Sequence, residues 1–229
     1  MTPFRHVIFD CDGVLVDSER ISARVFAQLL AELGLSLRQE DMFEHFVGLS
    51  MTQCLDRIAE MLGRPPPPGL VAAYDRHTRA ALEHEVEPVP GIEAALDRIA
   101  LPYSVASNGE HDKMRITLGV AGLWSRFEGR IFSAEDVERP KPAPDVYLLA
   151  AQRSGVAASE CLVVEDTPTG VTAARAAGMT VFGFAALMPA GRLREAGADL
   201  IFDDMRSLPD LIGAGRPAPW VSAQGASCR

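Results

Sequence analysis

Short apolar segments that resemble β-strands alternate with helical segments along most of the chain, and this alternation limits the fold more than any other feature. The strand-like segments are residues 6–9, 103–106, 131–133, 162–164, 180–184 and 200–202. The helical patterns between them are residues 92–100, 110–119, 144–154, 169–177 and 190–196. Apolar strands that alternate with helices in this way predict an α/β fold with a doubly wound parallel sheet.

Residues 19–85 interrupt the alternation, because they contain helical patterns and no convincing strand. These patterns cover residues 18–34, 40–46, 51–62 and 70–85. We therefore predict an α/β core of residues 1–18 and 86–212, with a small helical domain of residues 19–85 inserted after the first strand. Residues 213–229 are rich in Gly, Ala, Pro and Ser and are expected to form a loose tail. Asp17 or Ser18 is expected to cap the first helix, and Ser50 the third.

Charge and cysteine content exclude several classes of function. The formal net charge of −9 argues against a nucleic-acid partner or an anionic membrane surface, both of which would need a basic face. No signal peptide opens the chain, and no apolar run approaches the length of a membrane span. The four cysteines, Cys11, Cys54, Cys161 and Cys228, form no Cys-x-x-Cys pair, which indicates reduced thiols. We expect a cytoplasmic protein and infer no obligate protein partner.

Two aspartates follow the first strand directly. Side chains at i and i+2 of an extended chain point the same way, so Asp10 and Asp12 are expected to face one site, with Cys11 pointing away into the core. Two adjacent carboxylates repel each other, so such a site needs a cation or a shared proton. Mg²⁺ accepts carboxylate and phosphate oxygens together and would meet this need. The alternative is a solvated turn, in which aspartates are common.

The ends of three later strands also carry polar groups. They are Ser107-Asn108-Gly109 after the second strand, Lys141 between two prolines after the third, and Glu165-Asp166 after the fourth. Each has a plain structural alternative, which is a turn, a surface lysine and a helix cap respectively. Ligands of open α/β sheets bind at the carboxyl ends of the strands, so four such ends in succession favour one shared pocket.

These residues resemble the signature of the haloacid-dehalogenase-like (HAD) hydrolase superfamily. Its features here are Asp-x-Asp-Gly-x-Leu-x-Asp-Ser from residue 10 to 18, the later Ser107 and Lys141, and an acidic pair at 165–166. The resemblance covers nearly the whole core, and the helical insertion corresponds to the small cap domain of that superfamily. Within it, the chain is most similar to the β-phosphoglucomutase-like phosphatases. Residues 9–13, 107–109 and 113–114 are similar in particular to the branch that includes 6-phosphogluconate phosphatase.

The resemblance implies a role for each residue. Asp10 would be the nucleophile that forms an aspartyl-phosphate, and Asp12 the general acid–base, with a raised pKa. Mg²⁺ would be the cofactor. Its implied ligands are the Asp10 carboxylate, the Asp12 backbone carbonyl, Asp166 and, through water, Glu165. The implied phosphate-binding residues are Ser107, Asn108 and Lys141.

The implied function is a Mg²⁺-dependent phosphatase of a small phosphorylated metabolite, such as the sugar phosphate 6-phosphogluconate. A β-phosphoglucomutase-like isomerase is one alternative. The mutases carry a histidine and an arginine where this chain aligns Ser22 and Met51, so hydrolysis is favoured. A catalytically idle binding module is the second alternative, and the complete set of reactive residues argues against it. Substrate choice is assigned to the loop of residues 47–50.

Overall fold

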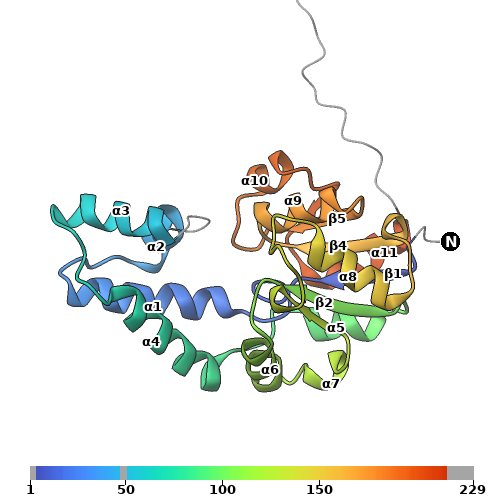
Figure 1. The fold of residues 1–229 in the computed structure, drawn as a ribbon, viewed down its shortest axis with the longest axis horizontal. Coiled ribbons are helices and arrows are strands. Elements are labelled where there is room, and N and C mark those ends of the chain that lie inside the picture. Colours follow the sequence, from blue (N-terminus) through green and yellow to red (C-terminus); the bar gives the residue numbers. More distant parts are fainter. Residues whose placement is uncertain (1–3, 47–50, 216–229) are drawn as a thin grey trace, which may run out of the picture.

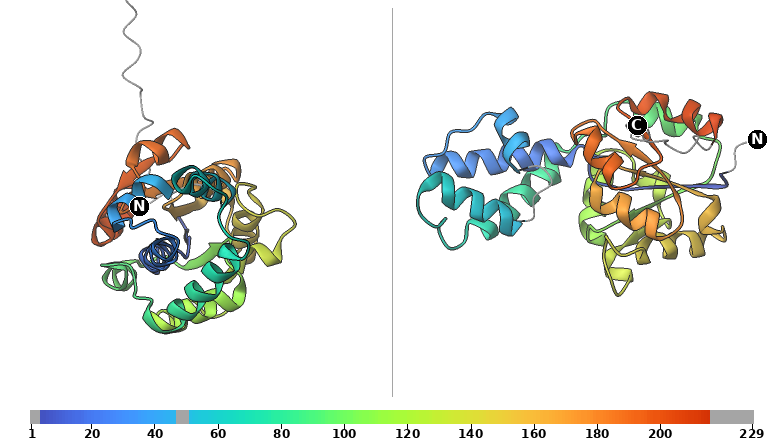
Figure 2. Two further views of the ribbon diagram at one scale, coloured as in Figure 1. Left: turned by 90° about the vertical axis from the view of Figure 1, so that its left-hand side faces the viewer. Right: turned by 90° about the horizontal axis from the view of Figure 1, so that it is seen from above.

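The computed structural model describes residues 4–46 and 51–215, apart from the side chains of residues 39, 40, 43 and 44. Figure 1 shows two parts, a sheet covered by helices and a block of four helices beside it. We call the first part the sheet body and the second, helices α1 to α4, the helical block. Seen from above, the helical block is joined to the sheet body at one end (Figure 2).

The sheet has six strands in the order β3-β2-β1-β4-β5-β6, and all neighbouring strands are parallel. The strands are β1 (His6–Phe9), β2 (Tyr103–Ser107), β3 (Ile131–Ser133), β4 (Cys161–Glu165), β5 (Thr180–Phe184) and β6 (Leu200–Phe202). The predicted doubly wound parallel sheet is therefore confirmed. The chain builds outward from β1 on one side and from β4 on the other, so the order reverses between these two strands. A ligand crevice is expected at the carboxyl ends there.

Helices cover both faces of the sheet. Along β1, Val7 and Phe9 belong to one buried cluster and Ile8 to another, as the alternation of a strand requires. The first face is covered by α5 (Ile92–Arg98), α6 (His111–Val120), α7 (Trp124–Phe127) and α11 (Leu208–Ala214). The second face is covered by α8 (Asp145–Ser154), α9 (Pro168–Ala176) and α10 (Ala190–Glu195). The sequence patterns did not predict the short helices α7 and α11.

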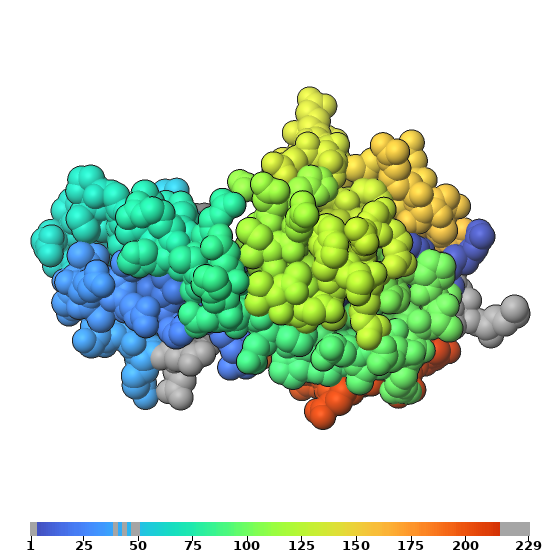
Figure 3. Space-filling model, turned by 90° about the horizontal axis from the view of Figure 1, so that it is seen from below, coloured from blue at the N-terminus to red at the C-terminus, as the bar shows by residue number. Residues whose placement is uncertain are grey.

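The helical block has its own buried side chains. It consists of α1 (Ser18–Glu32), α2 (Gln39–Phe46), α3 (Met51–Leu62) and α4 (Leu70–Glu85). The Phe26 ring lies 5.4 Å from the Phe46 ring and 5.0 Å from the Tyr74 ring, measured between centroids. Helix α4 packs against α1 and against α6 of the sheet body, and the space-filling view shows this junction (Figure 3).

The predicted cap of α1 is wrong. Asp17 occupies the N-cap position, but its side chain makes no capping hydrogen bond and instead forms an ion pair with Arg20 at 2.9 Å. The Ser18 hydroxyl donates to Asp12 rather than to the helix. The predicted cap at Ser50 lies outside the described residues, as do residues 216–229 of the predicted tail.

Two observations concern membranes and thiols. No helix within the described ranges is long and apolar enough to cross a membrane.

Cys11, Cys54 and Cys161 are buried, free thiols, and Cys228 lies outside the described residues. Cys11 lies in the apolar cluster on the α6 face and not in the crevice, as the strand parity predicted.

Candidate active site

Asp10 is a buried carboxylate at the end of β1 with a lysine as its direct partner. Its backbone N–H donates to the Val164 carbonyl, which continues the β1–β4 ladder and fixes the position of the residue. The Lys141 Nζ donates to Asp10 Oδ1 at 2.6 Å and to Glu165 Oε1 at 2.9 Å. Lys141 is 6% exposed, so its charge is compensated within the protein and not by water. The surface-lysine alternative is therefore wrong.

Glu165 is fully engaged by donors from three elements. Besides Lys141, its carboxylate accepts from the Tyr147 hydroxyl at 3.1 Å, and from the Thr167 N–H at 2.8 Å and hydroxyl at 2.9 Å. Gly170 makes this close approach to α9 possible, because a Cβ there would collide with the Glu165 carboxylate. Glu165 thus ties Lys141 to the start of α9.

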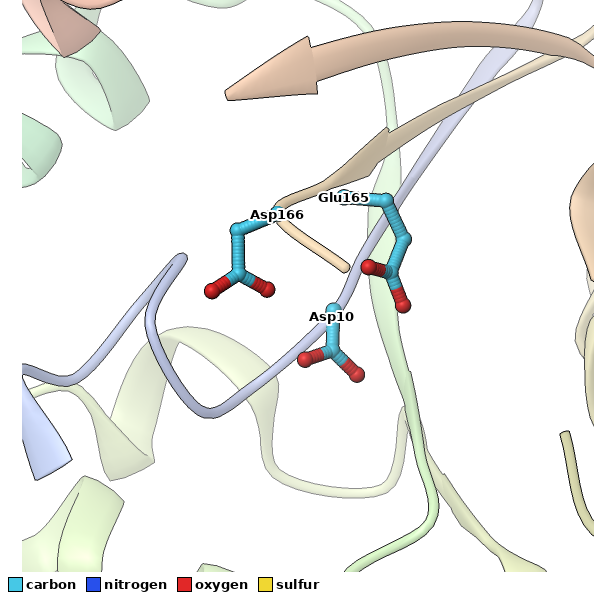
Figure 4. Close-up of side chains that lie close together, drawn as sticks. All are labelled: Asp10, Glu165 and Asp166. Carbon is cyan, nitrogen blue, oxygen red and sulfur yellow. The ribbon is translucent and has the colours of Figure 1, made fainter. Parts of the chain in front are cut away.

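Asp166, in the turn after β4, lies close to Asp10 and Glu165 (Figure 4). One oxygen from each of these three carboxylates lies within 4.8 Å of the others. Asp166 Oδ1 is buried and has no hydrogen-bond partner, which is costly unless a ligand satisfies it. Gly13, with φ of +75°, leaves room for Asp166, because a Cβ there would collide with its carboxylate. A set of carboxylate oxygens with one unsatisfied member fits a hard cation such as Mg²⁺.

Burial and neighbouring charges act on Asp10 in opposite directions. Burial raises the pKa of Asp10 to about 7, the Lys141 ammonium opposes this, and Glu165 adds to it. For Asp166, burial followed by the charges of Glu165 and Asp10 raises the pKa well above its ordinary value. One lysine therefore does not offset the rise in the pKa values of Asp10 and Asp166, and a further cation would lower both.

Asp12 is held as an anion by partners outside the strands. The Lys113 Nζ donates to Asp12 Oδ2 at 2.7 Å, and the Ser18 hydroxyl donates to Oδ1 at 2.6 Å. Burial alone would raise the pKa of Asp12, but the charge and hydrogen bond of Lys113 outweigh it and the pKa is lowered. The expected raised pKa is therefore wrong for this arrangement, because the Lys113 ammonium lies directly against the Asp12 carboxylate.

The segment after β2 forms the third side of the crevice. The Ser107 hydroxyl accepts from the Gly109 N–H at 3.1 Å. Asn108 clamps the loop of Lys141: its Oδ1 accepts from the Lys141 N–H at 2.8 Å, and its Nδ2 donates to the Lys141 carbonyl at 3.2 Å. Asn108 thus positions the lysine, in addition to the phosphate-binding role that the family resemblance implies.

All seven predicted site residues line one cavity of about 800 Å³ between the sheet body and the helical block. They are Asp10, Asp12, Ser107, Asn108, Lys141, Glu165 and Asp166. Ser22 and Met51, which align with the mutase residues, also face this cavity. The structure therefore brings the predicted residues together, while their individual roles remain predictions.

Four residues of this site were not among the predicted site residues. Lys113 and Ser18 hold Asp12, Tyr147 holds Glu165, and Gly170 makes room for it. Lys113 follows the second strand closely, so its place at the same sheet edge was a usable signal. Tyr147 and Gly170 gave no such signal, because their contacts depend on how α8 and α9 pack on the sheet.

Comparison with known proteins decides the family. The model of the family described as "Haloacid dehalogenase-like hydrolase" matches residues 7–184. The chain belongs to the haloacid dehalogenase-like hydrolases. It is 32% identical over 187 residues to a 6-phosphogluconate phosphatase of Escherichia coli, covering 81% of this chain and 85% of that one. The resemblance identified from the sequence is therefore confirmed, and the enzyme is a phosphoric monoester hydrolase of this family.

Two further relatives extend this result. Hexitol phosphatase A of Escherichia coli is 30% identical over 207 residues, covering 88% of this chain and 91% of that protein. A crystal structure of a HAD family hydrolase from Deinococcus radiodurans, with bound phosphate and sodium, superposes with a TM-score of 0.83. It is 32% identical and covers 95% of this chain and 100% of that chain. The fold and the family thus agree along nearly the full length of the chain.

Proposed function

We propose that this HAD hydrolase is a Mg²⁺-dependent phosphatase of small phosphorylated metabolites, in particular sugar phosphates, and acts through an aspartyl-phosphate on Asp10. The observation that carries the proposal is the convergence of Asp10, Lys141 and Asp166 from three loops on one buried point. The names of its relatives make 6-phosphogluconate and hexitol phosphates the first compounds to test.

The residues of this chain divide the reaction between them. Asp10 attacks phosphorus, and as a carboxylate it needs no base to activate it once ionised. Lys141 offsets the repulsion between Asp10 and the phosphate dianion and stabilises charge in the in-line transition state. Ser107 and the Asn108 N–H bind phosphoryl oxygens. Asp10, Asp166 and the Asp12 backbone carbonyl would hold Mg²⁺, which supplies charge neutralisation when bound, and Glu165 orients Lys141.

Asp12 is proposed to donate a proton to the leaving oxygen and then to accept one from the hydrolytic water. Its pKa is lowered by the Lys113 ion pair in this structure. An entering phosphate dianion brings negative charge beside Asp12 and competes for Lys113, and both effects raise the pKa of Asp12. Residues 19–85 are proposed to act as a cap that excludes water from this step. A cytoplasmic location stays a prediction.

The test is release of inorganic phosphate from a panel of sugar phosphates, with and without EDTA. We expect release that EDTA abolishes and added Mg²⁺ restores. Isomerisation of a hexose phosphate without phosphate release would instead favour the mutase. Ser22 and Met51, which stand where the mutases carry a histidine and an arginine, argue against that activity. Absence of any turnover, together with tight binding of panel members, would favour the binding module. Activity unchanged by EDTA would contradict the metal part of the proposal.

A further inference from the structure

The described side chains on the wall of the cavity that belongs to the helical block include few charged groups. The polar ones are Glu19, Ser22, Gln53 and Tyr74, and among them only Glu19 carries a carboxylate. No lysine, arginine or histidine of the described part of the helical block lines the cavity. The residues of the block whose side chains are not described, 39, 40, 43, 44 and 47–50, include no basic residue in the sequence.

The rest of this wall is apolar. Ala23, Phe26, Met42, Phe46, Met51 and Cys54 line it. Phe26 and Phe46 are each less than a tenth exposed, and their rings are in contact with each other. Such a surface offers no compensation for a charged group taken out of water, so a charged leaving group would lose hydration without gaining a partner.

Hydroxyl and carboxylate groups gather on this wall close to the reacting residues. The Ser22 side chain and the charge of Glu19 both act on Tyr74, and Glu19 also interacts electrostatically with Asp12. Together these groups offer both donors and acceptors, which is what the hydroxyl groups of a polyol require. They offer no fixed positive charge.

The total charge of the side chains that line the cavity also disfavours a charged leaving group. Five carboxylates and three cations line it: Asp10, Asp12, Glu19, Glu165 and Asp166 against Lys113, Lys141 and Arg192. Lys113 is paired with Asp12, and Lys141 is paired with Asp10. A divalent metal ion would bring the cavity close to neutrality, so the phosphate dianion alone makes it negative. A second anion on the substrate would add repulsion in a site of low dielectric constant.

Building on the proposed function, we infer that the substrate is a monophosphate whose leaving group is an uncharged hydroxylated molecule, and that Glu19, Ser22 and Tyr74 select it. Sugar acids, carboxylate-bearing phosphates and bisphosphates are disfavoured. We therefore expect a lower kcat/KM for 6-phosphogluconate than for the hexitol phosphate with the same carbon skeleton.

Sorbitol 6-phosphate and 6-phosphogluconate form a matched pair for the test. Both carry an open six-carbon chain with a phosphate on C6, and they differ at C1, which is an alcohol in the first and a carboxylate in the second. We expect kcat/KM for sorbitol 6-phosphate to exceed that for 6-phosphogluconate by about tenfold or more, which corresponds to roughly 1.4 kcal/mol.

Two variants test whether the wall of the helical block sets this ratio. Ser22→Arg adds a cation to the wall, and Glu19→Gln removes the only carboxylate among its described side chains. Each is expected to shift the ratio toward 6-phosphogluconate by about tenfold, the effect of roughly 1.4 kcal/mol. Gln28→Arg adds the same charge to α1 at an exposed position that does not line the cavity, and should leave the ratio unchanged. Thermal unfolding of each variant verifies that it is folded.

The outcomes separate this inference from the proposed function. Phosphate release from 6-phosphogluconate at a kcat/KM equal to or above that of sorbitol 6-phosphate would overturn the inference and leave the phosphatase standing. If Arg192→Gln then removed the activity on 6-phosphogluconate, Arg192 would be the carboxylate-binding residue. An unchanged ratio in both Ser22→Arg and Glu19→Gln would also overturn it. Release from no compound of the sugar phosphate panel would contradict the proposed function itself.

Discussion

Seven charged side chains reach the cavity from the sheet body, whereas the described side chains of the helical block contribute only Glu19. The sheet body places buried charges of opposite sign against each other, as with Lys141 between Asp10 and Glu165. The helical block presents aromatic rings, methionines and hydroxyls. This difference indicates a division of labour in which the sheet body carries out phosphoryl transfer and the helical block selects the group that leaves. The predictions below test the sheet-body half of that comparison.

Asp10→Asn is expected to have the largest effect. It removes the proposed nucleophile while keeping the shape of the side chain, so phosphate release should fall by about 10⁴-fold or more. Asp203→Asn, at an exposed position after β6, is the matched control and should keep wild-type activity. Steady-state phosphate release is the measurement. Residual activity of a few per cent in Asp10→Asn would show that another residue is the nucleophile.

His6 is a buried ionisable residue whose nearest hydrogen-bond partner is an uncharged hydroxyl, in contrast to the buried charges around Asp10. It begins the strand that ends before Asp10, it is 3% exposed, and its Nε2 lies 2.9 Å from the Ser104 hydroxyl. Burial, followed by the charge of Arg130, lowers the pKa of His6 from 6.5 to about 4. As pH falls, His6 is protonated in the unfolded chain at a higher pH than in the folded protein. The free energy of unfolding therefore decreases as pH falls from 6.5 toward 4.

His6→Gln should therefore remove part of the acid sensitivity. The difference in unfolding free energy between pH 7.5 and pH 4.5 should shrink by about 2 kcal/mol. Urea unfolding at the two pH values measures it, and His84→Gln, an exposed histidine on α4, serves as the control. An identical pH dependence in wild type and His6→Gln would mean that the His6 pKa is not lowered.

Gly170→Ala tests the close packing behind Glu165. The added methyl group would collide with the Glu165 carboxylate, which must then move away from Lys141 or from Thr167. We expect a loss of about 1–3 kcal/mol of stability and a clear fall in kcat. Gly119→Ala lies in α6 with no atom within 4 Å of the new Cβ, so it should be neutral or stabilising. Equal behaviour of the two variants would contradict the packing argument.

Tyr147→Phe is expected to have the smallest effect. It removes the hydroxyl that donates to Glu165 at 3.1 Å but keeps the ring, whose centroid lies 4.6 Å from the Lys141 Nζ. We expect a loss of about 1 kcal/mol in stability and a few-fold fall in kcat. Tyr147→Leu, which also removes the ring, should cost more. If the two variants were equal, the ring would contribute nothing to the position of Lys141.

The sequence was sufficient for the parts of this molecule that depend on strand periodicity. It placed all six strands and put Asp10, Lys141 and Asp166 at one edge, because parallel strands bring their carboxyl ends together. It did not reveal that Asn108 grips the backbone of Lys141. It also missed that Lys113 lowers the pKa of Asp12, since both depend on side-chain directions set by packing between distant segments. Helices α7 and α11 are too short for their periodicity to be recognised.

The two chain crossings between the sheet body and the helical block lie side by side and are hydrogen-bonded to each other. The Asp17 N–H donates to the Glu87 carbonyl, and the Val89 N–H donates to the Leu15 carbonyl, each at 2.9 Å. The helical block is therefore an insertion whose two ends lie next to each other. Exchanging residues 19–86 for the equivalent segment of another family member would keep Ser18 and create only two junctions, both beside this short ladder. New substrate preferences could be grafted onto an untouched set of reacting groups.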